Sequence, residues 1–449
     1  MHTTLKAPRI DDARHDTASR QQADDALFHK ITWRLIPLLF ACYVFNYLAR
    51  SNVGYAQLQM REQLGFSDAV FGLGAGIFFI GYALFEIPSN LLLARSGVRA
   101  SLLRIMALWG LTSAAMVFVR TPAQYHALRF LIGVFEAGFM PGVLYYLTLW
   151  YPSARRAQAT ALFLMAYGIA PIIAGPAAGL AMTYFDGAAG LRGWQWLFLL
   201  EGLPSVLLGV AAYFYFADSP AQARWLSATE KLRVRQMLHD EPAAHDAAAG
   251  HSVGAALRDA RVWLLGAMAF LIVAGVSALS FWQPMMMKAM GLSVLQVGLY
   301  SVLPAAAGVL ATIVVGRHSD RTLERRWHFA LSACAGGAGL ALTTLFMDNA
   351  GAALLCLSLA SAGIASALTI LWAVPGGFMA KNAAAGGIAL ISTVGASAGM
   401  VAPVMVGYIR TETGSFTLSL YIFSGMLLLS ALLMLFALPR SALPARQGG

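Results

Sequence analysis

Residues 316–326 read Gly-Arg-His-Ser-Asp-Arg-Thr-Leu-Glu-Arg-Arg, a short charged segment that follows one long apolar run and precedes another. A related pattern of basic residues stands 226 positions earlier, behind a different apolar run. At this offset the aligned residues are Asn90, Ala94, Arg95 and Arg99 in the first half and Gly316, Asp320, Arg321 and Arg325 in the second. The same offset places Arg155 opposite Lys381. Several matches at one offset predict that the chain is a two-fold repeat.

Twelve apolar runs surround these segments, six in each half. They lie near residues 32–57, 69–93, 102–119, 123–150, 157–183 and 194–216, and near 262–287, 293–315, 329–347, 351–375, 383–409 and 416–437. A helix needs about 20 mostly apolar residues to cross the hydrocarbon of a bilayer. Because lipid offers no partner to backbone polar groups, runs of this length predict helices. We therefore expect an all-α membrane protein whose twelve transmembrane helices form two pseudo-symmetric six-helix bundles.

The composition agrees with a membrane protein and argues against a single water-soluble core. The 449 residues are 59% hydrophobic and 12% charged, whereas soluble domains carry about 25% charged residues. The net charge of +10 comes from short basic patches between apolar runs, so nucleic-acid binding is not expected. His239, His245 and His251 recur at six-residue spacing. That spacing is a poor helical repeat for ligands, and no metal site is expected.

The distribution of lysine and arginine predicts the orientation. With a cytoplasmic N-terminus, 24 basic residues fall in inner loops and tails and 5 in outer loops, which follows the positive-inside rule. We expect both termini in the cytoplasm of a bacterial-type inner membrane, without a cleaved signal peptide. The expected parts are a disordered tail at 1–30, a bundle at 31–216, a linker at 217–260 that is partly helical, a second bundle at 261–437 and a tail at 438–449.

Several motifs carry a resemblance to a known family. They are Tyr47-Leu-Ala-Arg50-Ser-Asn52, Phe85-Glu-Ile-Pro-Ser-Asn90, Arg129-Phe-Leu-Ile-Gly-Val-Phe-Glu136, Gly193-Trp-Gln-Trp-Leu-Phe-Leu-Leu-Glu-Gly202, Asp218-Ser-Pro220 and the segment at 316–326. From about residue 31 to 437 the chain resembles the major facilitator superfamily. More narrowly, it resembles the anion:cation symporters, which include phthalate, tartrate, hydroxyphenylacetate and sugar-acid permeases. The resemblance implies a secondary active transporter that imports a small organic anion by proton symport and alternating access. It implies no cofactor, and we expect a monomer.

Three ionisable residues stand out within the predicted spans, where an unpaired charge costs several kcal/mol. They are Arg50, Arg129 and Glu136, while Glu86 and Glu201 lie nearer to helix ends. Two guanidiniums that face a central cavity would form a receptor for a carboxylate, because the planar fork of arginine donates two parallel hydrogen bonds. Glu136 lies two turns after Arg129 on the same face of its helix.

The resemblance assigns Arg50 and Arg129 to substrate binding and Glu136 to proton coupling. The residues also suggest neighbours for the substrate: the hydroxyl groups of Tyr47 and Tyr82 in the first half, and Trp372 and Ser392 in the second. Relatives commonly carry an acid in the first span where this chain has Ala49. We therefore expect Glu136 to be the main proton carrier.

The charged segments have a mechanical interpretation as well. Asp320 near a helix end, with Arg321 and Arg325 beside it, predicts a charge cluster between helices that stabilises one conformation. The alternative is a basic loop that only sets the topology. In the first half Arg95 and Arg99 recur, but alanine replaces the acid.

Other interpretations stay open at the level of sequence. Arg50 could be an interfacial arginine that extends to water, and Arg129 and Glu136 could form a purely structural ion pair. A proton-coupled exporter of drugs, or a membrane sensor on the same scaffold, would share these features. An ATP-driven pump is not expected, because no Gly-Lys-[Ser/Thr] phosphate loop occurs. No catalytic constellation indicates an enzyme.

Overall fold

The computed structural model describes residues 10–239, 257–375 and 381–438. Every regular element in those ranges is helical, and twelve spans are long and apolar enough to cross a membrane. The first six are α1 (Ile10–Leu64), α2 (Asp68–Ser96), α3 (Val98–Ala115), α4 (Pro122–Glu136) with α5 (Phe139–Trp150), α6 (Ser153–Tyr184) and α7 (Gly193–Tyr215). The last six are α10 (Ala260–Ala289), α11 (Val294–Tyr300) with α12 (Val302–Thr322), α13 (Arg326–Leu345), α14 (Ala350–Ala373), α15 (Lys381–Thr413) and α16 (Thr417–Leu432). The predicted twelve-helix architecture is confirmed.

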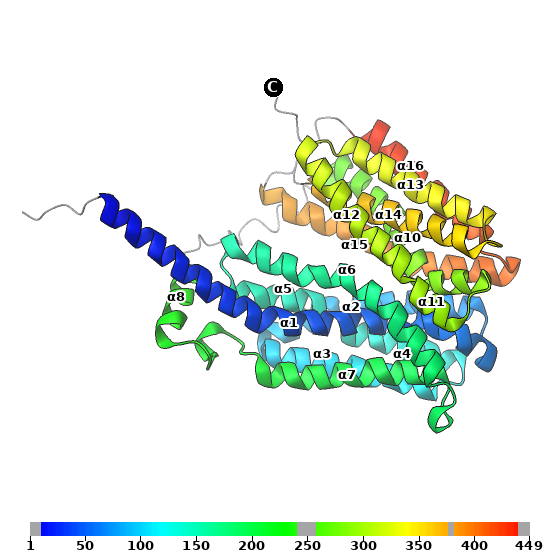
Figure 1. The fold of residues 1–449 in the computed structure, drawn as a ribbon, viewed down its shortest axis with the longest axis horizontal. Coiled ribbons are helices and arrows are strands. Elements are labelled where there is room, and N and C mark those ends of the chain that lie inside the picture. Colours follow the sequence, from blue (N-terminus) through cyan, green and yellow to red (C-terminus); the bar gives the residue numbers. More distant parts are fainter. Residues whose placement is uncertain (1–9, 240–256, 376–380, 439–449) are drawn as a thin grey trace, which may run out of the picture.

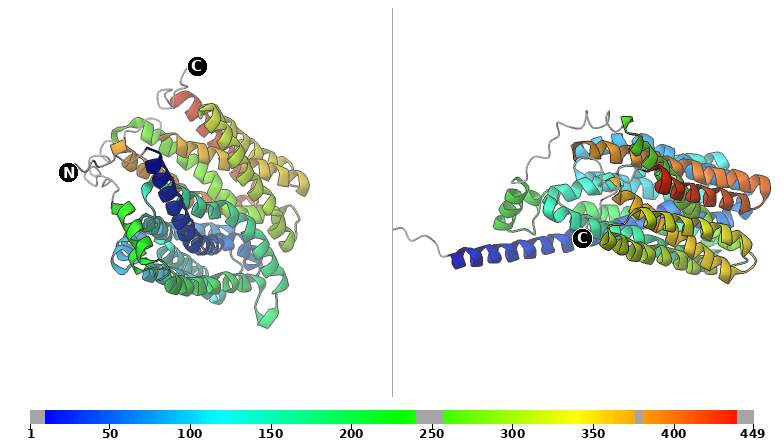
Figure 2. Two further views of the ribbon diagram at one scale, coloured as in Figure 1. Left: turned by 60° about the vertical axis from the view of Figure 1, so that its left-hand side comes forward. Right: turned by 90° about the horizontal axis from the view of Figure 1, so that it is seen from above.

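The two halves form separate bundles that lie side by side (Figures 1 and 2). The chain between them contains α8 (Ala228–His239), and residues 240–256 lie outside the described ranges. Figure 1 places α8 and the start of α1 at one end of the molecule and α11 at the other. We call the end with α8 the linker end, and the end with α11 the opposite end. Helix α1 runs from the linker end to the opposite end.

Residues 10–30 differ from the expected disordered tail, because α1 begins at Ile10 and is continuous to Leu64. Ion pairs with residues far away in the sequence hold the stretch from Asp24 to Lys30. The remaining residues of the two expected tails, 1–9 and 439–449, lie outside the described ranges. The pairs are Asp24–Arg233 at 2.7 Å, Lys30–Glu230 at 2.9 Å and Asp25–Arg155.

Two spans are interrupted, one in each half. In the fourth span α4 ends at Glu136 and α5 begins at Phe139. Pro141 lies in the first turn of α5 and has no N–H to continue the hydrogen bonding of the preceding turn. In the eighth span Ser301 separates α11 from α12, and Pro304 has the same effect. Interrupted helices in transporters commonly border binding sites.

Glycines bring the two halves into backbone contact at the opposite end. A Cβ atom on Gly72 of α2 would lie 2.5 Å from the carbonyl oxygen of Pro403 in α15. A Cβ atom on Gly179 of α6 would lie 2.9 Å from Cα of Gly298 in α11. Small residues allow membrane helices to approach this closely. The halves are therefore closed against each other at the opposite end.

A buried ion pair joins the halves at the same end. Arg410, near the end of α15, donates from Nη1 to Asp68 Oδ1 at 3.0 Å, and the two side chains are only 10% and 3% exposed. The N–H of Ala69 donates to the hydroxyl of Thr411 at 2.9 Å. These contacts connect the first turn of α2 with the last turn of α15.

Candidate functional site

Arg50 of α1 and Glu136 of α4 form an ion pair inside the first bundle. Arg50 Nε donates to Glu136 Oε1 at 3.0 Å, and Arg50 Nη2 contacts the same oxygen. The Glu136 side chain has no exposed surface, whereas that of Arg50 is 33% exposed. Glu136 is the last residue of α4, so the interruption of the helix lies directly beside its carboxyl group. The second carboxyl oxygen, Oε2, is buried without a hydrogen-bond partner.

Aromatic rings flank the Arg50 guanidinium. Its Cζ atom lies 5.4 Å from the ring centres of both Phe78 and Tyr82 on α2. The faces of such rings attract a cation, and more strongly where water is excluded. The sequence predicts Tyr82 as a hydroxyl donor to the substrate, and the structure places it beside Arg50 as a ring partner.

Arg129 does not face a cavity, contrary to the prediction of two guanidiniums exposed to the substrate. Its side chain is fully buried, and its Cζ lies 4.9 Å from the centre of the Phe78 ring. Its Nε donates to the carbonyl of Gly74 at 3.4 Å, and both terminal nitrogens are buried without a partner. Arg129 and Glu136 form no direct ion pair either, and the ion-pair partner of Glu136 is Arg50. Contact between Arg129 and a substrate would require Phe78 to move.

A cavity of about 560 Å³ lies between the two halves. It is lined by α1 and α6 of the first half and by α10, α12 and α14 of the second, and none of its lining residues within the described ranges is charged. This volume suits a small organic molecule. The hydroxyl and amide groups that line it belong to Tyr47, Ser51, Tyr55, Tyr167, Ser280, Gln283, Ser301, Thr312, Ser361 and Thr369.

The cavity contains one of the predicted substrate contacts, Tyr47, and several residues that the sequence analysis missed. Trp372, 40% exposed near the linker end of α14, and Ser392, exposed on α15, are not among its lining residues. Ser51 and Tyr55 follow Tyr47 at intervals of four residues, which places all three on one face of α1. That spacing is a signal from which both could have been predicted.

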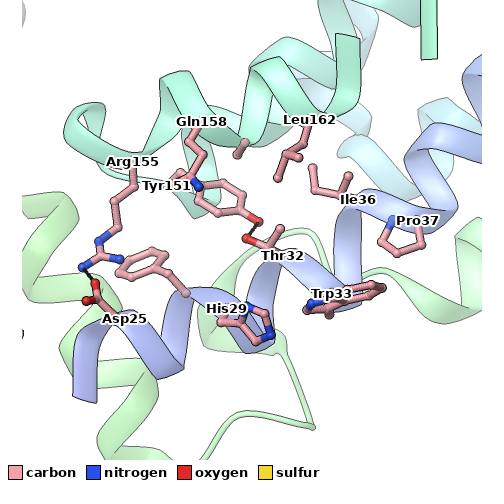
Figure 3. Close-up of a pocket in the computed structure, with 12 residues that line it drawn as sticks. Asp25, His29, Thr32, Trp33, Ile36, Pro37, Tyr151, Arg155, Gln158 and Leu162 are labelled. Carbon is pink, nitrogen blue, oxygen red and sulfur yellow. Dashed lines mark hydrogen bonds and ion pairs between the residues drawn. The ribbon is translucent and has the colours of Figure 1, made fainter. Parts of the chain in front are cut away.

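A second cavity, of about 620 Å³, lies at the linker end between α1 and α6. Figure 3 shows Arg155 in contact with Asp25, and the hydroxyl of Tyr151 donates to Thr32 at 3.1 Å. Arg155 is the one arginine among its lining residues, and its charge is already balanced by Asp25. The Arg50 region is therefore the stronger candidate for binding an anion.

The charged segment at 316–326 forms part of the expected cluster at the linker end. Arg325 Nη2 pairs with Asp320 Oδ1 at 2.6 Å, and Arg325 Nη1 donates to Ser319 Oγ at 3.0 Å. The pair connects the last turn of α12 with the residue that precedes α13. Within the described ranges Arg321 makes no hydrogen bond or ion pair. Stabilisation of one conformation by this cluster stays a prediction.

Glu324 lies in the same turn and interacts with the first turn of α13. Its carboxylate accepts the N–H of Trp327 at 2.9 Å and contacts His328 Nδ1 at 2.9 Å. Burial raises the pKa of Glu324, but the hydrogen bonds from Trp327 and His328 outweigh burial, so the net effect lowers it. A carboxylate at this position also favours the helix N-terminus electrostatically. No group of three His, Cys, Asp or Glu in the described ranges is arranged to hold a metal ion.

In the first half, Asp218 supplies the acid that Ala94 lacks. Its Oδ1 accepts the N–H of Arg99 at 2.9 Å in the first turn of α3. Arg99 Nε donates to the carbonyl of Tyr213 near the end of α7 at 2.7 Å. Arg95 makes no hydrogen bond or ion pair among the residues that the structure describes. The motif Asp-Ser-Pro at 218–220 thus has a structural role that the sequence did not reveal.

Comparison with known proteins identifies the family. Residues 39–403 match the family model of the Major Facilitator Superfamily. The chain belongs to this superfamily. As a major facilitator it resembles the solved structure of a bacterial homologue of the human lysosomal transporter Spinster in its inward-facing, occupied conformation. The TM-score is 0.74 over 90% of this chain and 96% of that one, and at 15% identity the likeness shows the fold alone.

Curated relatives of this major facilitator are named as transporters. The chain is 43% identical to the putative metabolite transport protein NicT of Pseudomonas putida, over 94% of this chain and 95% of the relative. It is 41% identical to a putative tartrate transporter of Agrobacterium vitis, over 94% and 93%. It is 38% identical to a quinolone resistance transporter of Acinetobacter baumannii, over 90% and 93%. The protein is therefore a multi-pass membrane transporter.

Proposed function

We propose that this major facilitator imports a small organic anion together with protons, by alternating access. The observation that carries the proposal is the Arg50–Glu136 pair, in which a partly exposed guanidinium is neutralised by a fully buried carboxylate. The names of the relatives support the substrate class, since one is a putative tartrate transporter and tartrate is a small hydroxylated dicarboxylate.

Competition for Arg50 would couple the substrate to a proton. Arg50 directs two nitrogens at one oxygen of Glu136, so its fork is not matched to both oxygens of that carboxylate. A substrate carboxylate can accept two parallel hydrogen bonds from the same fork. Glu136 then loses its counter-charge in a buried position, where an isolated carboxylate is costly. It binds a proton, so that substrate binding and proton binding favour each other, as symport requires.

The positive-inside rule favours cytoplasmic termini, because the inner loops and tails then hold 24 basic residues and the outer loops 5. The linker end is then cytoplasmic, and the closed opposite end faces outward. In this arrangement the conformation is inward-facing, with the glycine contacts and the Asp68–Arg410 pair as the outer barrier. Alternating access would break this barrier and close the linker end.

The cavity lining favours a hydroxylated or aromatic acid. The rings of Tyr47 and Tyr167 meet edge to face with centres 6.5 Å apart, which gives the cavity an aromatic wall. Gln283 and Thr312 of the second half offer neutral hydrogen-bonding groups. Since Arg129 is buried, one carboxylate would bind by charge at Arg50 and the rest of the substrate by hydrogen bonds and ring contacts.

Drug export is the second candidate function, because a relative of 38% identity is named as a quinolone resistance transporter. A quinolone also carries a carboxyl group, so binding at Arg50 does not separate the two functions, and the direction and range of transport must be measured. Purified protein in proteoliposomes separates the two. We expect accumulation of tartrate, phthalate or a sugar acid when the lumen is made alkaline, and loss of accumulation when a protonophore is added. Proton-driven movement of a fluoroquinolone, without movement of any of these acids, would favour export.

A further inference from the structure

Glu201 of α7 is a buried acid that the mechanism above does not use. Its side chain lies eight residues, about 12 Å, from the start of α7 at the opposite end, and the residue is 4% exposed. Its Oε2 atom is buried without a hydrogen-bond partner. None of the residues that the structure describes forms a hydrogen bond or an ion pair with its carboxyl group.

The side chain that faces Glu201 is equally unsatisfied. Asn52 of α1 is 1% exposed, and both its amide oxygen and its amide nitrogen lack hydrogen-bond partners. Asn52 lies at the level of Glu201, because the N–H of Trp194 in α7 donates to Gln59 Oε1 in α1 at 2.9 Å and each residue is seven positions from that contact along these antiparallel helices. An ionised carboxylate in such a place would cost several kcal/mol, and a neutral carboxyl group, which can donate to an amide oxygen, would cost far less.

Tyr55 connects this acid with the cavity. It lies three residues after Asn52, so the two side chains share one face of α1. The Tyr55 hydroxyl and Ser301 Oγ of the second half converge on Gly175 of α6, whose Cβ position lies 3.0 Å from the first and even closer to the second. Tyr55 and Ser301 both line the cavity of about 560 Å³. Tyr55 therefore lies between the helix face that carries Asn52 and the space that a substrate would occupy.

Among the residues that the structure describes, no charged group pairs with Glu201. Arg50, two residues before Asn52, is engaged by Glu136. Gly202, next to Glu201, packs on Gly110 of α3, which carries no charge. The ionisable residues of the other helices packed on α7 lie away from it: Arg99 and Arg104 near the start of α3, Arg155 and Arg156 at the start of α6, Tyr167 in the cavity wall and Tyr184 at the end of α6.

We infer that Glu201 is a second proton-binding site of the transport cycle, which exchanges its proton with the cavity through Tyr55. In the exchange the Glu201 O–H bond breaks as its proton passes to the Tyr55 oxygen, and Tyr55 gives its own hydroxyl proton to water in the cavity. Tyr55 and Ser301 come together from the two halves, which places this step beside the closed opposite end. The inference rests on the proposed symport for its role, but the protonation state can be measured without transport.

Infrared spectroscopy of the protein in liposomes tests the site. At neutral pH we expect a carbonyl stretch from a protonated carboxylic acid, which Glu201→Gln removes and Glu136→Gln retains, because Glu136 is paired with Arg50. Gln resembles the neutral acid, so the fold should survive. Should Glu201→Gln fail to fold, Glu201→Asp must shift the same band. Transfer to heavy water should shift the band, several-fold more slowly in Tyr55→Phe. A band unaffected by changes at Glu201 overturns the inference.

Transport measurements then separate this inference from the proposed function. In wild-type proteoliposomes the ratio of protons to substrate should exceed that of Glu201→Gln by one. If the Glu201 band is present but uptake does not depend on the pH gradient, the symport proposal is wrong, whereas the protonation of Glu201 is confirmed. If uptake follows the pH gradient and the proton ratio is the same in Glu201→Gln, Glu201 is not part of the cycle.

Discussion

Arg50 binds Glu136 through two of its nitrogens but through only one of the two carboxylate oxygens. The other oxygen is buried and has no partner. The pair is thus neutral in charge but incomplete in hydrogen bonding. A pair of this kind holds the guanidinium in place without using the full capacity of its planar fork. It is suited to being exchanged for a ligand whose carboxylate can meet both nitrogens.

Replacement of Arg50 by lysine should impair uptake even though the positive charge is kept. An ammonium cannot donate two parallel bonds to a carboxylate, and losing such a contact costs about 2 kcal/mol or more. We expect the KM for substrate to rise roughly 30-fold. Thermal stabilisation by substrate should weaken in parallel. An unchanged KM in Arg50→Lys would assign Arg50 a structural role.

Replacement of Glu136 by glutamine should weaken coupling strongly. The variant removes the group that binds a proton when the substrate takes Arg50, so accumulation driven by a pH gradient should fall and the proton ratio should drop by one. Exchange of labelled for unlabelled substrate at equal concentrations should continue, since it needs no net proton movement. Accumulation and a proton ratio equal to those of wild type in Glu136→Gln would show that Glu136 does not carry a proton.

A methyl group at Gly72 should favour opening of the opposite end. Its Cβ would lie 2.5 Å from the carbonyl oxygen of Pro403, and backbone on both sides leaves no flexible atom to move. Overpacking of this kind costs about 1–3 kcal/mol. We expect a cysteine placed at Val404, which contacts the same interface at Gly76, to react faster with an impermeant thiol reagent. Gly425→Ala is the matched control, since no atom lies within 4 Å of its Cβ position. Equal rates in the two variants would contradict the assignment.

Neutralising Asp68 should open the same end by a different route. Asp68→Asn leaves Arg410 with a buried, unbalanced charge, and breaking a buried pair costs about 3–5 kcal/mol. Spin labels on the connections at 65–67 and 414–416 should move apart. Exchange of the two residues, Asp68→Arg with Arg410→Asp, should restore part of the shorter distance. Failure of both variants to change the distance would remove the ion pair from the barrier.

The pair between Lys30 and Glu230 should make the docking of α8 sensitive to acid. The hydrogen bond from Lys30 lowers the pKa of Glu230. The stabilisation is therefore complete above the ordinary pKa of a glutamate and is lost as pH falls through the lowered value. The pair is partly exposed, so its contribution is under about 1 kcal/mol. The protection of α8 against hydrogen exchange, corrected for the intrinsic exchange rate at each pH, should fall in acid, and Lys30→Met should weaken this pH dependence. Lys231→Met, which alters a neighbouring lysine, should behave as wild type.

The fold was predictable because its signal is carried by long uniform segments. Twelve apolar runs and one 226-residue offset are enough to define the spans and the two halves. The start of α1 was not predictable in this way. Asp24 and Lys30 are stabilised by partners about two hundred residues away on α8. The composition of the segment around them does not reveal those partners.

The candidate site was only partly predictable for the same reason. The cost of burying charge singles out Arg50, Arg129 and Glu136 correctly as unusual residues. It does not say which arginine meets the carboxylate. That depends on the interruption after Glu136 and on Phe78, whose ring lies against both guanidiniums. Such choices are decided by packing between helices, which periodicity along one helix does not describe.

Helix α1 is continuous and is much longer than a membrane is thick. Its 55 residues correspond to about 80 Å at the rise of an α-helix, whereas the hydrocarbon layer is about 30 Å thick. A tilt of the bundle that barely displaces Arg50 would displace the start of α1 much further, because that end projects beyond the bundles (Figure 1). A fluorophore on Gln21 would therefore move a large distance each time the first half tilts. Its movement would allow the transport cycles of single molecules to be timed.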